Sequence, residues 1–590
     1  MKKMTKKMFT GMMALIMCFG MVGCGGNTGD GGSSNDNSTD VNQQLGVTNP
    51  YELKVFNFGG GYGREWLDTL ITRYKQERAG KEFVINGVTY DGVDFKVDSE
   101  KTMMSTIVTN GVPYDVVFQE QVLYNKFVKQ GDVFAPMTEV LTTENPYEPG
   151  TTLEGKLTEE QKAFYKMDTD GDGQGDTYYG IPHYAGYVGI IYNKHMFETN
   201  GWYFAKDYDK ADLENALNFC FTNDLNNRTA GPDGKTGTDD DGLPTTYEEF
   251  YALCEYISIN NTPLSWAGKY RDEYLNWFIT ALTANNEGLE QMQLNYSYTG
   301  EAKNLVSVDE NGVVSPLPAE QINGAENGYE LAKQAGKYYA FSFMEKIAKE
   351  GWFSEGSIGD TYEQTNAQRD FVRGTSNEKD RAAMLIDGVW WEMEANSYFE
   401  EIQQTLGRND RDRYGWMPLP CVTEELAQAR ATALQNGGNG YTLMDTHNSL
   451  AFLGKNIDAE AKKIAIDFLQ FAYTDESLVE FSKITDTTKA VQYKMSNEDK
   501  AQMSAFGRSI VAMQETSDLV YGFSKTPFYQ LNEETFTDYK NMYASRYTAT
   551  ATPVKVAFDE FRKGKTAKEY FDGLYTYQKG LWDSGAIVKN

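Results

Sequence analysis

Cysteine is scarce in this sequence of 590 residues, which contains only five. Two of them, Cys18 and Cys24, lie near the N-terminus, and the others are Cys220, Cys254 and Cys421. Three cysteines in so long a chain do not make a disulfide framework. Cys220 and Cys254 could pair, but buried free thiols are the expected state. No C-x-x-C spacing occurs, so we expect no structural zinc site.

Histidine is scarcer still, with His183, His195 and His447 as the only three. None of them has a metal-ligand neighbour at helical spacing, and no H-E-x-x-H motif is present. A G-x-S-x-G elbow is also missing. The sequence therefore offers neither a zinc-peptidase site nor the nucleophile of an α/β-hydrolase.

Positive charge is in deficit. Lysine and arginine number 55 against 85 aspartates and glutamates, which gives a net charge of −30. So acidic a surface argues against nucleic acid as a partner and against electrostatic docking on anionic lipid. It suits an external domain, which we expect to be a monomer.

Long hydrophobic runs are absent apart from Met8 to Val22, which is too short to span a bilayer comfortably. Four lysines precede this run, and the sequence Met21-Val22-Gly23-Cys24 follows it. We interpret residues 1–23 as a lipoprotein signal peptide and Cys24 as the lipidated first residue of the mature protein. Residues 24–50 are rich in Gly, Ser, Asn, Asp and Thr, which predicts a flexible tether. The expected location is the extracellular face of a bacterial cell membrane.

Beyond the tether, strands alternate with helices, which predicts an open α/β sheet. Strands are expected at 53–58, 93–97 and 114–118, and an apolar stripe predicts a helix over 64–77. The Gly-rich turn at 59–63 reads G-G-G-Y-G-R, which fits neither a dinucleotide fingerprint nor a P-loop. We interpret this turn as backbone that a ligand can approach at the carboxyl end of a strand.

Two acidic loops have the composition of calcium sites. In the first, alternating carboxylates match the early positions of an EF-hand loop, although Tyr179 stands where the bidentate glutamate belongs. Its candidate ligands are Asp168, Asp170, Asp172, Gln174 and Asp176. The second loop, at 231–242, offers Asp233, Asp239 and Asp241. The alternative for both is a solvated acidic turn.

Four stretches resemble family-1 extracellular solute-binding proteins, the maltose-binding-protein-like receptors of ABC importers. They are Y-G-I-P-x-Y-x-G-x-x-G-I-I-Y-N-K within 176–198, T-I-V-T-N-G-V-P-Y-D-V-V-F-Q at 106–119, A-A-M-L-I-D-G-V-W-W at 382–391, and the amphipathic helix at 461–472. Each motif is loose, and the four together are specific.

The resemblance implies an α/β, two-lobed, periplasmic-binding-protein-like fold of type II. Lobe I would comprise 51–183 and 421–488, and lobe II 184–420 and 489–590 with an insertion at about 284–328. Crossings between the lobes are expected near 184–191, 416–420 and 485–491.

The same resemblance implies a sugar in the cleft between the lobes, delivered to membrane permease subunits. Aromatic faces suit sugar rings, and polar side chains suit their hydroxyls. The nominated ligand-binding residues are Trp390, Trp391, Trp266, Tyr62, Tyr184, Asn57, Glu120, Arg271 and Asp387.

Two other classes of function stay open. A calcium-containing glycoside hydrolase would need two cleft carboxylates at a set separation, for which Asp94, Glu120 and Asp387 can be nominated. A sensory or adhesion lipoprotein would have the same sequence features as an importer receptor.

We predict that Cys24→Ala releases the protein from the membrane fraction, because two acyl chains on this residue would provide the stable anchor. Detergent partitioning of the wild type and the variant measures this. A Cys24→Ala protein that stays in the detergent phase would contradict lipidation at this position.

Overall fold

The structure is a computed structural model that describes residues 38–589, except 103, 121, 132, 170–174, 216, 375–380, 447, 538–545 and 548–554. Cys24 and the predicted signal peptide lie outside the described residues. Within the described part of the chain, no helix is long and apolar enough to cross a membrane. Cys220, Cys254 and Cys421 are buried free thiols, as predicted.

The first sheet has five strands in the order β4-β1-β5-β20-β8. β1 (Pro50–Phe58) runs parallel to β4 (Gly92–Glu100) and to β5 (Val116–Gln119). β20 (Leu450–Leu453) is antiparallel to both β5 and β8 (Gly180–Pro182). The three strands predicted at the start of the mature chain are thus confirmed. Because β1 and β5 are parallel neighbours, the loops that follow them leave the same edge of the sheet.

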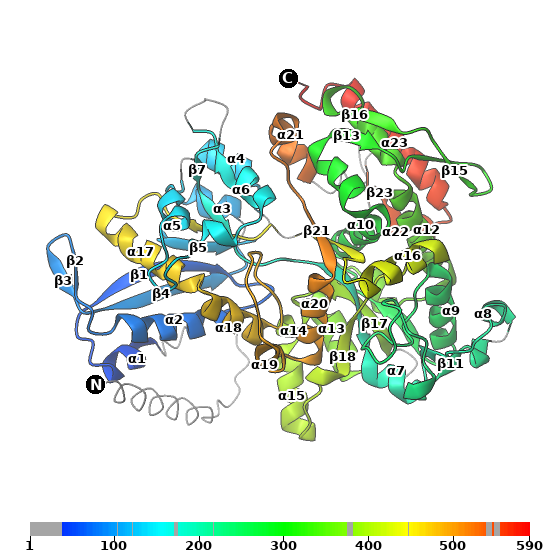
Figure 1. The fold of residues 1–590 in the computed structure, drawn as a ribbon, viewed down its shortest axis with the longest axis horizontal. Helices are drawn as coiled ribbons and strands as arrows, with labels where there is room; N and C mark the ends of the chain where they lie inside the picture. Colours follow the sequence, from blue (N-terminus) through cyan, green and yellow to red (C-terminus); the bar gives the residue numbers. More distant parts are fainter. Residues whose placement is uncertain are drawn as a thin grey trace.

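Helices α2 (Glu65–Arg78), α17 (Ala459–Ala472) and α18 (Asp475–Thr485) pack beside this sheet (Figure 1). The ring of Phe468 on α17 lies 5.2 Å from Tyr74 on α2 and 5.0 Å from Phe95 on β4. The apolar faces predicted for 64–77 and 461–472 therefore meet in one core. We call this sheet with its helices the first lobe.

The second sheet has four strands in the order β12-β17-β9-β18. β12 (Thr262–Ser265) is parallel to β17 (Ala382–Gly388), and β9 (Val188–Asn193) is antiparallel to β17 and to β18 (Tyr414–Met417). α9 (Tyr247–Ser258) begins with the predicted capping box of Thr246 and Glu249. This sheet with its helices is the second lobe, and Figure 1 shows the two sheets on opposite sides of the molecule.

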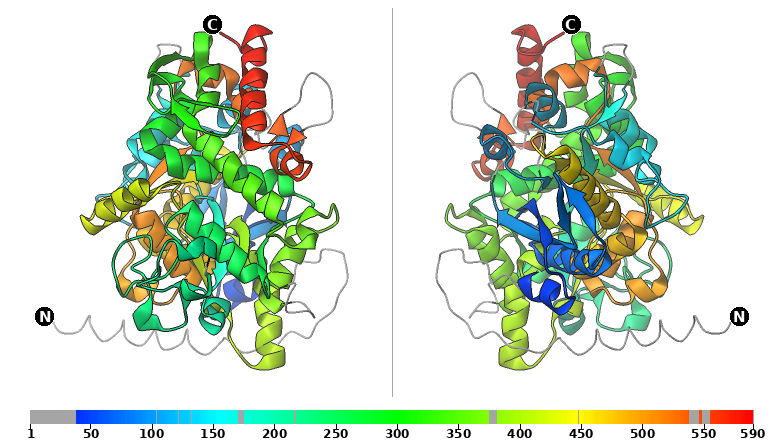
Figure 2. Two further views of the ribbon diagram at one scale, coloured as in Figure 1. Left: turned by 90° about the vertical axis from the view of Figure 1, so that its right-hand side faces the viewer. Right: turned by 90° about the vertical axis from the view of Figure 1, so that its left-hand side faces the viewer.

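Long helices stack outward from the second sheet. α10 (Arg271–Ser297) packs on β9 and β17, α12 (Ala335–Glu350) packs on α10, and α23 (Ala567–Asp583) packs on α12, upright beside the green helices in Figure 2. The insertion predicted from residue 284 starts too early, because α10 continues through a kink at Gly288 to Ser297. The hairpin predicted within 305–315 is present as β14 (Val306–Val308) and β15 (Val314–Pro316).

Three segments connect the lobes. The first, 183–187, links β8 to β9 as predicted. The second differs from the prediction at 416–420: β18 stays in the second sheet, and the chain returns to β20 after Thr446. The third follows α18, where Tyr184 and Lys489 form an isolated β-bridge.

The predicted lobe boundary at residue 421 also needs correction. α16 (Glu424–Gln435) packs on the second lobe, since Arg430 donates to Leu419 O at 2.6 Å and to Asn285 Oδ1 at 2.8 Å. β19 (Tyr441–Asp445) pairs with β21 (Ser517–Tyr521). Residues 421–445 therefore belong with the second lobe, and the chain rejoins the first lobe only at β20.

Candidate functional site

The Gly-rich loop 59–63 after β1 reaches across to the second lobe. Gly61 has φ +55°, and its N–H donates to Glu394 Oε1 over 3.3 Å. A methyl group placed on Gly61 would lie 3.1 Å from Glu120 Oε1, 3.7 Å from Trp390 Cβ and 3.8 Å from Tyr184 Oη. Four segments of chain thus converge on this one backbone position, which we call the interlobe junction.

Each of these side chains is placed by the end of a secondary structure element. Glu120 follows β5 at the same sheet edge as the Gly-rich loop, and Tyr184 lies on the first connecting segment. Trp390 precedes the single turn α14 (Trp391–Glu394), so Glu394, four residues further on, lies on the same face of that turn. Both lobes therefore contribute to the junction.

The junction is strongly acidic. The Nε2 atom of Gln368 on α13 (Gln364–Arg373) donates to Glu394 Oε2 at 2.8 Å and to Asp387 Oδ2 at 3.1 Å. Burial, with the nearby charge of Glu394, raises the pKa of Asp387 well above its ordinary range. The same two causes raise the pKa of Glu120 to about 8, against a smaller lowering by Lys101. Closing the lobes thus favours protonated carboxyls.

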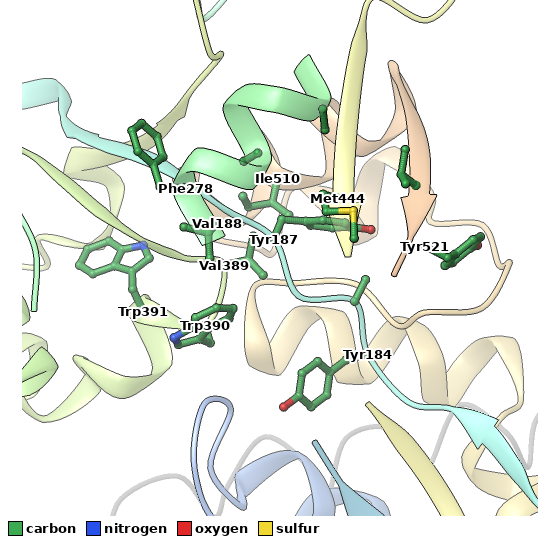
Figure 3. Close-up of a cluster of buried hydrophobic side chains, with 14 of the residues drawn as sticks. Tyr184, Tyr187, Val188, Phe278, Val389, Trp390, Trp391, Met444, Ile510 and Tyr521 are labelled. Atoms are coloured by element: carbon green, nitrogen blue, oxygen red, sulfur yellow. The ribbon is translucent and has the colours of Figure 1, made fainter. Parts of the chain in front are cut away.

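Aromatic side chains also lie at the interlobe junction. Tyr62 and Tyr184 meet edge to face with ring centroids 4.4 Å apart, and Tyr62 Oη donates to Thr487 Oγ1 at 3.3 Å. Trp390 stands edge-on to Trp277 at 6.1 Å. Tyr184 is 5% exposed, and its hydroxyl has no hydrogen-bond partner among the described residues. In Figure 3 this hydroxyl points toward the blue loop that follows β1.

The cleft is closed in this structure. The pocket beside the loop has room for about one water molecule, and its lining includes Asn57, Gln119 and His183. Small-molecule sites usually enclose roughly 300–1,000 Å³. A sugar of any length would therefore need the Gly-rich loop to separate from Trp390 and Glu394.

Three nominated residues lie elsewhere. Trp391 is 0% exposed and packs in the core of the second lobe against Tyr414 at 5.0 Å, so it points away from Trp390 (Figure 3). Trp266 is likewise 0% exposed and meets Phe558 edge to face. Arg271 is held by Asp559 and Asp360 in ion pairs.

Asn57 acts on the loop itself, because its amide donates to Gly63 O at 3.0 Å and to Ser99 Oγ at 3.1 Å. It positions the Gly-rich loop. Of the nominated set, Tyr62, Tyr184, Glu120, Asp387 and Trp390 lie at the junction, and Asn57 lines the pocket beside it.

Sequence reasoning missed Glu394, Gln368 and Trp277. For Glu394 a signal existed, since it lies four residues after Trp390 at helical spacing. Gln368 and Trp277 come from α13 and α10, and no local pattern connects those helices to the cleft.

Behind the junction, a buried pair joins two connecting segments. Lys489 Nζ lies 2.5 Å from His183 Nδ1 and 4.1 Å from the ring centroid of Phe481. Burial lowers the pKa of both Lys489 and His183 well below their ordinary ranges. Burial thus disfavours charge on both groups, and their contact ties the first connecting segment to the third.

The first acidic loop is described only at its ends, because Asp170, Asp172 and Gln174 lie outside the described residues. Asp176 accepts hydrogen bonds from the N–H and hydroxyl of Thr169, at 3.3 and 2.9 Å, and Asp168 lies on the same turn. Calcium in this loop stays a prediction.

In the second loop, the Thr238 hydroxyl lies 2.7 Å from Asp240, 3.2 Å from Asp241 and 3.4 Å from Asp233. The predicted ligand Asp239 points outward and pairs with Lys194 instead. Asp240 therefore takes the position in the loop that was predicted for Asp239. Across the described residues, no three His, Cys, Asp or Glu side chains are grouped so as to hold a metal ion.

No protein-family model matches this chain, and no curated protein matches it. Among solved structures, a chitin oligosaccharide binding protein aligns at 16% identity over 90% of this chain and 99% of its own, with a TM-score of 0.49. RafE in complex with raffinose aligns at 13% identity over 90% and 99%, with a TM-score of 0.48. The apo form of RafE from Streptococcus pneumoniae aligns at 14% identity over 91% and 99%, with a TM-score of 0.47. Similarities this low assign neither a family nor a ligand, so the function is argued from the site itself.

We predict that the ligand-free protein opens as the pH rises. The pKa of Glu120 goes from 4.5 in water to about 8 in the closed cleft, so closure binds a proton. The stabilisation of the closed form by this protonation is fully present below about pH 4.5 and is lost as the pH rises through about 8. Between these values it falls by about 1.4 kcal/mol per pH unit. The radius of gyration from X-ray scattering should therefore be larger at pH 8.5 than at pH 5.

Glu120→Gln should reduce this difference, and Glu120→Gln with Glu394→Gln should abolish it. Glu159→Gln is the control, because the Glu159 side chain is 85% exposed and pairs only with Lys162 among the described residues. A pH dependence that survives in the double variant would show that these carboxyls do not control the opening.

We also predict that a chelator lowers the unfolding temperature, since a metal that binds only the folded state at 100 times its Kd stabilises it by about 2.7 kcal/mol. Asp176→Asn should remove the response if the first loop is responsible, and Asp241→Asn if the second is. An unchanged midpoint, together with no metal in elemental analysis, would rule calcium out of both loops.

Proposed function

We propose that this protein is the substrate-binding lipoprotein of an ABC importer, which captures a carbohydrate between its lobes and delivers it to a membrane permease. The observation that carries this proposal is the interlobe junction, where Gly61, Glu120 and Tyr184 meet Trp390 and Glu394. Carboxylates accept hydrogen bonds from sugar hydroxyls, and aromatic rings pack on the C–H faces of sugars.

The connecting segments support closure as the working motion. Thr446 N donates to Gly186 O at 2.9 Å, and Ala490 N donates to His183 O at 3.3 Å, so the three segments run side by side. Small backbone rotations in adjacent segments let two lobes move as rigid bodies. A ligand that contacts both lobes binds the closed form better and shifts the population toward it.

The proposed ligand is an oligosaccharide rather than a single sugar, because the junction is flanked by aromatic side chains from several elements. The lipid on Cys24 and the tether at 24–50 would keep the closed, monomeric receptor near the permease on the outer face of the membrane. Calcium in the acidic loops is proposed as a structural ion only.

A glycoside hydrolase is the second candidate, because Glu120 has the raised pKa of a general acid and lies near a second carboxyl, Glu394. The nominated Asp94 is not part of such a site, since Lys75 Nζ holds its carboxylate at 2.5 Å within the first lobe. A sensory or adhesion lipoprotein would bind sugar without a permease, which association with permease subunits in membranes would distinguish.

We predict that oligosaccharides raise the unfolding temperature and reduce the radius of gyration at pH 8.5, with the ligand recovered intact. Trp390→Ala should weaken binding by about 1–3 kcal/mol. Trp391→Ala is the matched comparison: it removes a core side chain and should lower the free energy of unfolding by about 3–5 kcal/mol. Titration calorimetry, scattering and chromatography of the recovered sugar measure these effects.

Cleaved sugar in that chromatography would contradict the receptor proposal and favour the glycoside hydrolase. Binding without compaction of an open form would contradict the closure mechanism. Full affinity in Trp390→Ala would place the sugar elsewhere.

A further inference from the structure

The interlobe junction gathers the carboxyls of Glu120, Asp387 and Glu394, and the donors to Asp387 and Glu394 are neutral amides. Gln368 Nε2 donates to both, Gly388 N donates to Asp387 Oδ1 at 2.7 Å, and Gly61 N donates to Glu394 Oε1. The carbonyl oxygen of Gln368 is buried and has no hydrogen-bond partner among the described residues. The charge of Glu394 raises the pKa of Glu120, and the charge of Lys101, on an exposed side chain, lowers it.

The Gly-rich loop supplies one of these neutral donors from the first lobe. Glu394 Oε1 accepts from the backbone N–H of Gly61, and Glu120 Oε1 lies on the other side of the same residue. A peptide N–H offers one hydrogen bond and no net charge, so it leaves the mutual repulsion of the two carboxylates in place. In this structure the loop occupies the place between the carboxyls where a better donor would fit.

The tyrosine hydroxyl is an independent indication of a ligand. Tyr184 Oη is buried, lacks a partner among the described residues and lies next to Gly61. Leaving a buried hydroxyl without a hydrogen bond costs about 1–3 kcal/mol. Tyr62 brings a further ring to Tyr184, with ring centroids 4.4 Å apart, and ring faces attract cations.

We propose that the ligand carries a protonated amine, and that it is an amino sugar whose ammonium group lies between Glu120 and Glu394. This inference rests on the proposed function, because it specifies the chemistry of the same site. An ammonium has three donors, enough for both carboxylates and for Tyr184 Oη.

Charge favours such a ligand over a neutral sugar. A neutral hydroxyl leaves at least one carboxyl protonated in the closed cleft, whereas an ammonium pairs with the ionised forms. Hydrogen bonds between charged partners are roughly twice as strong as neutral ones. The net charge of −30 also raises the concentration of cations near the surface. Binding should therefore release protons from Glu120 and Glu394.

The test compares glucosamine oligosaccharides of two to four units with glucose oligosaccharides of the same linkage, where a neutral hydroxyl of similar size replaces the ammonium, and with their N-acetylated counterparts, where an acetyl group removes the charge and adds bulk. Titration calorimetry at one pH in two buffers of different ionisation enthalpy gives both affinity and proton release. We expect the free amines to bind at least about tenfold more tightly, a difference of about 1.4 kcal/mol, with protons released.

Glu394→Gln should reduce that preference to about one without abolishing binding of the acetylated sugars, and Glu120→Gln should act in the same direction. Glu159→Gln should keep the full preference. Thermal unfolding of each variant confirms that it is folded.

The outcomes are distinguishable. Acetylated or neutral oligosaccharides that bind as well as the amines would overturn the inference and leave the proposed function standing. A preference for amines that persists in both glutamine variants would also overturn it. If no carbohydrate of either kind binds, both the inference and the proposed function fail.

Discussion

The side-by-side packing of three connecting segments is the constraint on which the rest of the structure depends. Gly186 accepts from Thr446, His183 accepts from Ala490, and Tyr184 bridges to Lys489. These contacts join segments that lie hundreds of residues apart in the chain. They set the distance between the two sheets, and they place Tyr184 where the lobes meet.

The electrostatics of the junction follow from that geometry. Each lobe carries its own carboxyl, Glu120 after β5 and Glu394 on α14. Separated, these groups would be hydrated and ionised. When the lobes close, the two carboxyls lie on either side of Gly61 and lose their water. A proton, the Gly-rich loop and the proposed ligand would then compete for the place between them. For a ligand at the junction, as proposed, affinity would depend on how well that ligand replaces the Gly61 N–H.

Local chemistry was enough to predict most elements of the first lobe and the start of α9 in the second lobe. The strand at 53–58, the helix at 64–77 and the capping box at Thr246 depend on side chains within a few residues of one another. The errors have physical causes of another kind. The segment at 416–420 was predicted to connect the lobes, but Trp416 lies on β18, and its ring packs closely over Gly189 of β9 in the sheet. An edge strand and a connecting segment are both extended and apolar, so their sequences look alike and only the pairing in the sheet distinguishes them.

The sequence by itself determined the α/β character, the strand ends that bear the Gly-rich loop and Glu120, and the acidic charge, and the secretion signal stays a prediction. These are properties of composition and short-range pattern. Tertiary structure alone decided that Trp390 faces the cleft while Trp391 enters the core, because adjacent residues on a turn point in different directions and only packing selects between them. It also decided that Glu120, Tyr184 and Glu394 share one place around Gly61, because a site made by two lobes exists only when distant segments fold together.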